Sequence, residues 1–341
     1  MRQIPVLLSA NFDAAQVETI RAAHPAIVLH GAEGGYAIEP PSGLDAQEMT
    51  YPRYRPEIDI DAILHGVEVI IASRLPRGIS ARAPQLKWVQ YVGAGLDHLM
   101  PADELRRATY VITNFSGVHA IPLAEAVLTM MLTFVKSWSV FHDQQRRHLW
   151  QRHVIGELHG QTVGIIGLGR VGRQIARVCS SLGMRVVAVR RSEPTGVPVD
   201  HVEHVFSRTQ LHELLAVSDF VVGSAPATPE THHMLGEAEL RHMKPGAYLI
   251  NVGRGQLIDE PVLVRALAEG WIAGAGLDVF EAEPLPEQSP LWDLPNVFVL
   301  PHQGSDTFST LDRGVDLIRD NLRRYIDGRP LENVVDPARG Y

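Results

Sequence analysis

The sequence lacks the features that mark secreted, membrane-spanning and nucleic-acid-binding proteins. Its single cysteine, Cys179, cannot form a disulfide within the chain, which is typical of a protein of the reducing cytoplasm. The N-terminal apolar run is too short for a signal peptide or a membrane span, so no membrane association is expected. The 39 acidic residues outnumber the 31 basic ones, and the net charge of −8 argues against nucleic acid as a partner.

What is present is typical of a globular α/β protein. The length of 341 residues favours two domains, and 45% hydrophobic with 21% charged residues is ordinary globular usage. Short apolar runs alternate with longer segments of helical character, a pattern that predicts parallel sheets with crossover helices. The first group of strands is expected at Ile4–Ala10, Ala26–His30, Val67–Ser73, Leu86–Gly93 and Tyr110–Phe115. The second group is expected at Thr162–Gly167, Arg185–Arg190, Phe220–Ala225, Ala247–Val252, Ile272–Phe280 and Val297–His302.

Two long helical segments connect and follow these groups. Apolar residues recur at helical spacing over Ala120–Arg147, which predicts one long helix whose surplus apolar surface could pack on its own domain or form a dimer. A second apolar stripe runs over Ser305–Ile326 and could return to the first group of strands. The first domain would then be discontinuous in sequence.

The stretch Thr162–Ala176 has the order of an apolar strand, a Gly-x-Gly-x-x-Gly turn and the start of a helix. In such a turn Gly167 permits the tight bend, Gly169 lets a pyrophosphate approach the backbone, and Gly172 allows close helix–strand packing. The N–H groups of the helix N-terminus then bind the phosphates. Because strand, turn and helix occur together, we predict a dinucleotide site here.

The next strand leads into Arg190, Arg191 and Ser192, about 20 residues beyond the glycines, where an NAD-binding protein carries an acidic residue. Two guanidinium groups and a hydroxyl suit a 2′-phosphate through charge-assisted hydrogen bonds. We therefore predict that NADP(H) is preferred over NAD(H), although these arginines could instead be a solvated strand end.

Three later segments place polar residues at or just beyond the carboxyl ends of apolar strands, where doubly wound sheets bind ligands. They are 248–259 with Arg254, 276–286 with Asp278 and Glu283, and 299–305 with His302. An arginine, carboxylates and a histidine at adjacent strand ends are suited to hydride-transfer chemistry.

With these motifs in this order, the chain resembles the D-isomer-specific 2-hydroxyacid dehydrogenase family, and within it most closely the NADP-dependent glyoxylate/hydroxypyruvate reductases. The motifs extend over nearly the whole chain and also include 93–98, 114–119 and 228–231. The resemblance implies two doubly wound α/β domains in a homodimer. A Rossmann-type nucleotide-binding domain (residues 113–305) would be inserted in a flavodoxin-like substrate domain (residues 1–112 and 306–341), with the helix at about 120–147 as the dimerisation element.

The family's catalytic groups correspond to Arg254, Glu283 and His302. Reduction of a small 2-oxo acid to a D-2-hydroxy acid needs a proton on the developing alkoxide, which a protonated His302 can supply. Glu283 would hold the other ring nitrogen and favour the imidazolium. Arg254 would bind the substrate carboxylate and polarise its carbonyl.

The resemblance also implies the residues that contact the two small molecules. Backbone N–H groups at Val92, Gly93 and Ala94 would bind the substrate with Arg254 and His302, the alternative being a plain tight turn. The expected cofactor contacts are Gly167, Gly169, Arg170, Val171, Gly172, Arg190, Arg191, Ser192, Ala225, Pro226, Val252, Gly253, Asp278 and Gly304.

Some features leave the function open. Gln303 and Asp306 follow the histidine where small or apolar residues are commoner in the family, so the substrate preference is not fixed. The alternatives are a dehydrogenase for a bulkier 2-oxo acid and a non-catalytic NADP-sensing regulatory protein. No metal is expected, because the paired histidines at 201/204 and 232/233 have no carboxylates or thiolates at ligand spacing.

Overall fold

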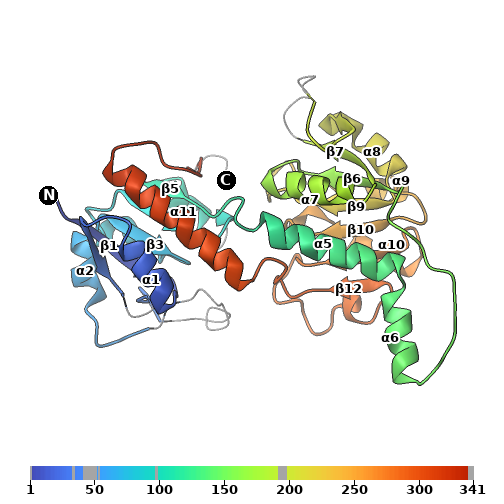
Figure 1. Ribbon diagram of the computed structural model, residues 1–341, viewed down its shortest axis with the longest axis horizontal. Helices are drawn as coiled ribbons and strands as arrows, with labels where there is room; N and C mark the ends of the chain where they lie inside the picture. The colour runs from blue at the N-terminus through green and yellow to red at the C-terminus, as the bar shows by residue number, and fades with distance from the viewer. Residues whose placement is uncertain are drawn as a thin grey trace. The chain divides into compact units, whose positions relative to one another are not determined.

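The computed structural model describes residues 2–32, 35–40, 52, 54–96, 99–190 and 198–336. The chain forms two compact units, Met1–Val118 with Thr307–Tyr341 and His119–Asp306 (Figure 1). Each unit contains one parallel sheet with helices on both faces, so the predicted α/β class with two doubly wound sheets is confirmed.

The sheet of the first unit has the order β2-β1-β3-β4-β5, which is the flavodoxin-like arrangement. Its strands are β1 (Ile4–Ser9), β2 (Ile27–His30), β3 (Val69–Ala72), β4 (Trp88–Tyr91) and β5 (Val111–Thr113). The central strands β3 and β4 are fully buried and β1 nearly so, whereas the edge strands β2 and β5 are partly exposed. The helices of this unit are α1 (Ala14–Arg21), α2 (Ile60–Gly66), α3 (Ile79–Arg82), α4 (Ala102–Leu105) and α11 (Phe308–Ile326).

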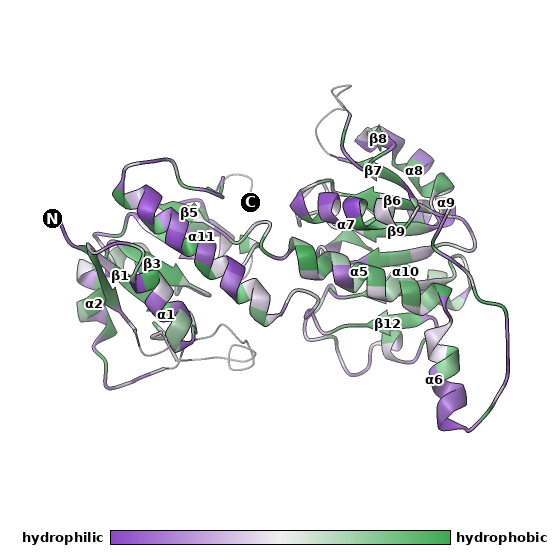
Figure 2. Ribbon diagram, viewed as in Figure 1, coloured by the Kyte–Doolittle hydropathy of each residue, from purple (hydrophilic) through white to green (hydrophobic). Residues whose placement is uncertain are grey.

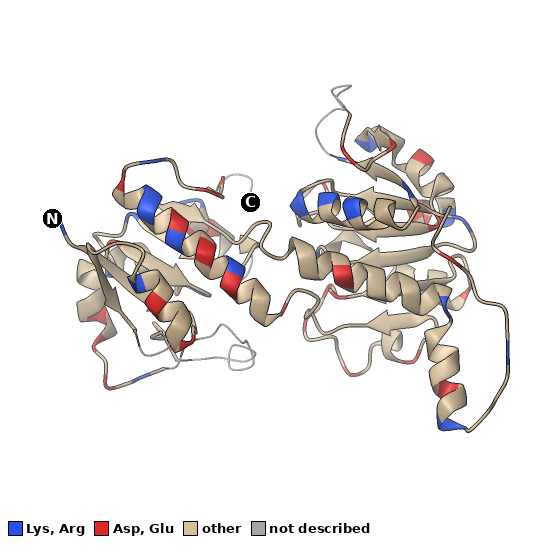
Figure 3. Cartoon of the chain, in the orientation of Figure 1, with Lys and Arg blue, Asp and Glu red and all other residues tan. Residues whose placement is uncertain are grey.

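The C-terminal helix α11 packs on the first unit. Its Val315, Ile318 and Leu322 are buried in the core that includes strands β1, β3 and β4. A buried polar network reinforces this packing, because the Asn321 amide donates to Gln90 Oε1 at 3.1 Å. The outer side of α11 carries charges of both signs (Figure 3). The predicted return of the tail to the first strand group therefore agrees with the structure.

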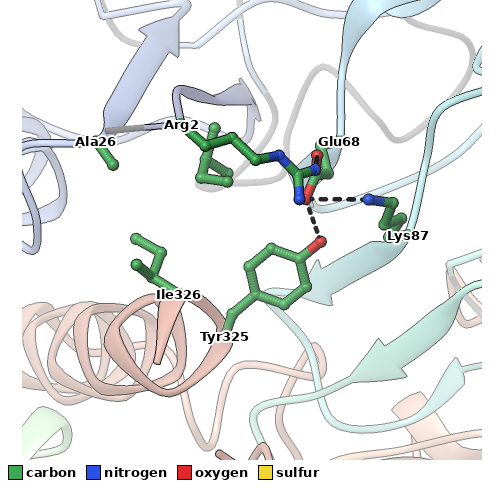
Figure 4. A pocket seen from close by; sticks show the side chains of 7 residues that line it. Arg2, Ala26, Glu68, Lys87, Tyr325 and Ile326 are labelled. Carbon is green, nitrogen blue, oxygen red and sulfur yellow. Dashed lines mark hydrogen bonds and ion pairs between the residues drawn. The ribbon is translucent and has the colours of Figure 1, made fainter. Parts of the chain in front are cut away.

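A cavity of about 420 Å³ lies at the amino ends of the first unit's strands (Figure 4). Buried Glu68 accepts hydrogen bonds there from the Tyr325 hydroxyl at 2.6 Å and from the Arg2 guanidinium. The Lys87 ammonium lies 3.5 Å from the same carboxylate. Burial and the neighbouring carboxylate raise the pKa of Tyr325 above its ordinary value. This cluster connects the end of α11 to the sheet.

The sheet of the second unit has the order β12-β11-β10-β9-β6-β7-β8, the Rossmann arrangement extended by one strand. Its strands are β6 (Thr162–Ile166), β7 (Arg185–Val189), β8 (His204–Phe206), β9 (Phe220–Gly223), β10 (Tyr248–Asn251), β11 (Gly274–Leu277) and β12 (Val297–Val299). The three-residue β8 was not predicted. The helices are α5 (Ala120–Val135), α6 (Trp138–Arg146), α7 (Arg170–Ser181), α8 (Leu211–Val217), α9 (Glu237–His242) and α10 (Glu260–Ala268).

The prediction of one long helix over Ala120–Arg147 is wrong. The helix breaks after Val135, because Ser137 adopts the left-handed conformation with φ of 52°, and α5 and α6 meet at a bend of 66°. Helix α5 is hydrophobic along most of its length and packs against α7, whereas α6 buries none of its residues (Figure 2). Among the described residues no single helix could cross a membrane; only α5 and α6 taken together reach the required length and apolarity.

Candidate functional site

The glycine-rich turn between β6 and α7 has the geometry of a phosphate cradle. Gly167 has a φ of 101°, which favours glycine, and a Cβ at Gly172 would lie 2.2 Å from the Gly167 carbonyl oxygen. In contrast, nothing lies within 4 Å of the Cβ position of Gly169. The backbone is therefore tightly packed on the protein side and open at Gly169, the N-cap residue just before α7, where helical N–H groups favour an anion.

The charge of α7 adds to this preference. Its sequence contains Arg170, Arg173 and Arg177 and no acidic residue (Figure 3). Val171 lies in its first turn. A dinucleotide pyrophosphate therefore fits this turn both sterically and electrostatically.

The loops that follow β9 and β10 pack directly against the glycine-rich turn. The Ser224 hydroxyl donates to the Gly167 carbonyl at 2.8 Å. Cβ atoms at Gly167 and Gly253 would both lie within 3 Å of Ala225 backbone atoms, so only glycines allow these loops to approach so closely. Four expected cofactor contacts, Ala225, Pro226, Val252 and Gly253, thus lie in the loops after β9 and β10.

Arg190 directly follows β7 and is half-buried. Arg191 and Ser192, the other two residues predicted to bind a 2′-phosphate, lie outside the described residues. The position after β7 therefore carries a basic residue where an acidic one would bind the ribose of NAD.

The polar segments predicted at strand ends come together at one edge of the second sheet. Strands β10, β11 and β12 are adjacent, and Arg254, Asp278 and His302 follow them in that order. The Nδ1 atom of His302 lies 2.7 Å from Oε2 of Glu283, whose Oε1 accepts the Phe280 N–H at 3.0 Å. Both carboxylate oxygens of Glu283 are thus engaged, which fixes its orientation toward the imidazole.

His302 has an uncommon backbone conformation and a raised side-chain pKa. Its backbone has a φ of 53°, a left-handed conformation that is uncommon for residues other than glycine. The hydrogen bond to Glu283 raises the pKa of His302 above its ordinary value, while burial and the Arg254 guanidinium oppose the rise. The pair therefore favours the imidazolium.

Asp278 supports the loop that carries His302. Its carboxylate accepts the N–H groups of Gln303 at 2.9 Å and of Gly304 at 3.0 Å, and its side chain is buried. A Cβ at Gly304 would lie 2.7 Å from Oδ2 of Asp278. Burial raises the pKa of Asp278 to about 6. Asp306 closes the turn by donating its N–H to the Gln303 carbonyl, and burial raises its pKa as well.

Arg254 lies at the start of a single 3-10 turn, Gly255–Leu257. Asn251, at the end of β10, donates to the Arg254 carbonyl at 2.8 Å and accepts the Gly253 N–H at 3.1 Å. Gly255 packs directly on the next loop, since its Cβ would coincide with the Phe280 backbone. The role of Asn251 was missed in the sequence, although an asparagine two residues before a glycine at a strand end is a signal for such a turn.

The predicted substrate residues of the first unit follow β4. A Cβ at Gly93 would lie 2.4 Å from the Tyr91 ring, and the Ala94 carbonyl accepts the Asn114 amide at 2.7 Å. Val92 donates its N–H to Ala72 and is thereby engaged in the sheet. Within the described part of the chain, the N–H groups of Gly93 and Ala94 donate to no other residue. These two amides, rather than that of Val92, could bind a carboxylate.

Comparisons with known proteins agree with this geometry. The model for the NAD-binding domain of the D-isomer-specific 2-hydroxyacid dehydrogenases matches residues 128–304. The glyoxylate reductase of Thermococcus gammatolerans is 37% identical over 279 residues, covering 79% of this chain and 81% of that protein. Glyoxylate/hydroxypyruvate reductase B of Pectobacterium carotovorum is 36% identical over 291 residues, covering 83% and 89%.

A solved structure extends the similarity to the whole fold. The D-isomer-specific 2-hydroxyacid dehydrogenase of Xanthobacter autotrophicus, in complex with NADPH and MES, matches with a TM-score of 0.78 and 30% identity and covers 100% of both chains. The family resemblance noted in the sequence is thus confirmed, and with it an oxidoreductase that uses a nicotinamide cofactor. The chain belongs to the D-isomer-specific 2-hydroxyacid dehydrogenase family.

Proposed function

We propose that the protein is an NADP(H)-dependent reductase that converts small 2-oxo acids, such as glyoxylate or hydroxypyruvate, to D-2-hydroxy acids. The observation that carries the proposal is the His302–Glu283 pair, with Nδ1 and Oε2 2.7 Å apart, beside Arg254 at the carboxyl edge of a Rossmann sheet. The names of the relatives from Thermococcus and Pectobacterium support the substrate class.

The proton would come from His302. Because Glu283 holds Nδ1, the second ring nitrogen, Nε2, is the one that would protonate the carbonyl oxygen as the C=O bond becomes a C–O–H group. His302 is then left neutral, and in the reverse direction it takes the proton back. Arg254 would bind the substrate carboxylate through two parallel hydrogen bonds and stabilise the charge that develops on the oxygen.

The cofactor would be held by the turn from Gly167 to Gly172 and by the loops after β9 and β10. When bound, NADPH supplies the hydride that adds to the carbonyl carbon. The preference for NADP(H) is supported by Arg190 at the end of β7 and by the NADPH in the Xanthobacter relative.

The two units would bind different molecules, one the cofactor and the other the substrate. We propose residues 113–305 as the nucleotide-binding domain and residues 1–112 with 306–341 as the substrate domain, whose Gly93 and Ala94 amides would anchor the substrate carboxylate. Asp278 and Gly304 would lie near the nicotinamide, where the hydrogen bond that the Gly304 N–H donates to the Asp278 carboxylate fixes the backbone.

The active form would be a homodimer. Helix α6 buries no residue of its own, and exposed apolar side chains are concentrated on it and on the segment that follows. They include Trp138, Val140, Leu149, Trp150, Val154 and Ile155. A second copy of the chain would cover them. Light scattering at micromolar concentration should give twice the chain mass of 37.6 kDa, and a monomer would contradict the proposal.

The proposed activity is tested by following NADPH absorbance at 340 nm with glyoxylate, hydroxypyruvate and a branched 2-oxo acid, each repeated with NADH. We expect the highest kcat/KM for a small oxo acid with NADPH, and Arg190→Ala should reduce the ratio of NADPH to NADH kcat/KM. An equal or higher kcat/KM with NADH would overturn the cofactor preference. A lack of turnover with all oxo acids, with NADPH binding retained, would overturn the reductase and favour a sensing role.

A further inference from the structure

We infer that His233 is a positioning residue, which joins the loop that carries Arg254 to the loop that carries Glu283. The inference rests on the proposed function, because it assigns His233 a task in the same site. His233 lies in the loop before α9, distant in sequence from both loops, and belongs to the same unit.

The backbone of His233 is attached to the arginine loop. Its N–H donates to the carbonyl of Gln256, two residues after Arg254, at 2.7 Å. Next to it, Leu235 donates to Leu257 at 3.0 Å in an isolated parallel bridge. His233 has a φ of 49°, so the chain adopts a left-handed conformation where its ring turns toward the glutamate loop.

The side chain of His233 is attached to the glutamate loop. Its Nε2 lies 2.5 Å from Oε1 of Glu281, two residues before Glu283, and its Nδ1 lies 3.9 Å from Asp259. The Glu281 N–H in turn donates to Oε2 of Glu260 at 3.1 Å. One residue therefore bonds both segments that present the proposed catalytic groups.

The charges around the ring explain why a histidine is useful here. Three carboxylates, Asp259, Glu260 and Glu281, lie close together at this point, and burial, with a further contribution from the Glu281 charge, raises the pKa of Glu260. The His233 ring lies between Asp259 and Glu281, and its hydrogen bond to Glu281 keeps the glutamate loop close to the start of α10. The His232 ring packs 4.0 Å from that of His233. Within the described residues these groups are not arranged to hold a metal ion.

The position of the glutamate loop matters because the two loops already touch at Gly255 and Phe280, where no side chain could be inserted. A small displacement at Glu281 would be transmitted over two residues to Glu283 and would lengthen its hydrogen bond to His302. Misplacement of a catalytic group by about 1 Å can cost about 100-fold in rate.

The test compares His233→Asn with His233→Gln. Asparagine tolerates the left-handed backbone well but is too short to reach Glu281, whereas the glutamine amide can occupy the place of Nε2. We expect His233→Asn to lower kcat/KM for the oxo acid about tenfold and His233→Gln to restore most of it. His212→Gln is the matched control. The Nε2 atom of His212 lies 3.0 Å from Oε1 of Glu239, a similar pair that involves neither of the two loops.

Two readouts separate positioning from a merely structural role. NADPH affinity, measured by fluorescence, should be unchanged in both variants, since the glycine turn is not touched. The His302 ring, titrated by NMR, should have a lower pKa in His233→Asn and a nearly native pKa in His233→Gln. A native His302 pKa in both variants, or a higher kcat/KM for His233→Asn than for His233→Gln, would overturn the inference. If the native protein reduces no oxo acid, the proposed function fails, while the NMR titration still decides the role of His233.

Discussion

The two units have the same kind of parallel, doubly wound sheet, but the charged cluster described in each lies at the opposite edge of its sheet. In the first unit Arg2, Glu68 and Lys87 lie at the amino ends of the strands. In the second unit Arg254, Asp278, Glu283 and His302 lie beyond the carboxyl ends. At its own carboxyl edge, after β4, the first unit offers backbone amides instead. The comparison shows that a similar sheet topology does not determine which chemical groups lie at which edge of the sheet.

The two clusters also differ in how they respond to protons. Glu68 is surrounded by the Tyr325 hydroxyl, the Arg2 guanidinium and the Lys87 ammonium, and burial raises the pKa of Tyr325, so this hydroxyl keeps its proton. The second cluster contains His302, with a raised pKa, and Asp278, with a pKa of about 6. The second cluster therefore contains groups that can exchange protons in the range where enzymes work. The first cluster, around Glu68, connects helix α11 to the sheet of the first unit.

The largest effect is expected from His302→Asn, which retains a residue that tolerates the left-handed backbone. Loss of the proton donor should lower kcat by about 10³-fold. The melting temperature and NADPH affinity should remain near native. Turnover within tenfold of native would exclude His302 as the general acid.

The next largest effect is expected from Arg254→Lys, because an ammonium cannot form the two parallel hydrogen bonds that a guanidinium makes with a carboxylate. We expect kcat/KM for the oxo acid to fall about 100-fold, since a pair of charge-assisted bonds is weakened. Arg177→Lys, on the exposed side of α7, is the control. Equal losses in the two variants would contradict the assignment.

Glu283→Gln should move the pH profile of reduction. The native pKa of His302 is raised chiefly by Glu283, so the imidazolium persists to higher pH. With a neutral partner the pKa falls, and the alkaline decline in kcat should begin at lower pH, by about one pH unit. An unchanged profile would mean that Glu283 does not control the charge of His302.

Asp278→Asn should stabilise the protein at neutral pH. Burial raises the pKa of this carboxyl from 3.8 to about 6, so the folded state holds the proton more tightly than the unfolded state. Ionisation of Asp278 therefore lowers the free energy of unfolding. This loss is absent at pH values below 3.8 and complete above about 6, where it is on the order of 2 kcal/mol. Unfolding in urea at pH 5 and pH 8 should show a larger gain for the variant at pH 8. A gain that does not grow with pH would contradict the assigned pKa.

The smallest effect is expected at the amino edge of the first unit. Glu68→Gln keeps an acceptor for Tyr325 but loses the charge that Arg2 and Lys87 face, which should cost about 1 kcal/mol of unfolding free energy. Because this cluster is structural, kcat and KM should not change. A loss of activity without a loss of stability would break the distinction between the two edges.

Much of the site could be predicted because its residues follow recognisable strands. Arg254 and His302 each come after an apolar run, and adjacent parallel strands bring such ends together. The break at Ser137 could not be predicted, since serine carries no strong preference for the left-handed conformation it adopts. The His233–Glu281 contact was also missed, because its partners are 48 residues apart in loops without a periodic pattern.

The central claim is that His302, held by Glu283, delivers the proton. Its most direct test is to measure kcat/KM for glyoxylate against pH at saturating NADPH and to titrate the His302 ring by NMR in the NADPH complex. The account predicts that the alkaline midpoint of the rate profile coincides with the ring pKa and that both lie above the ordinary value of 6.5. A rate that stays constant while the ring loses its proton would contradict it.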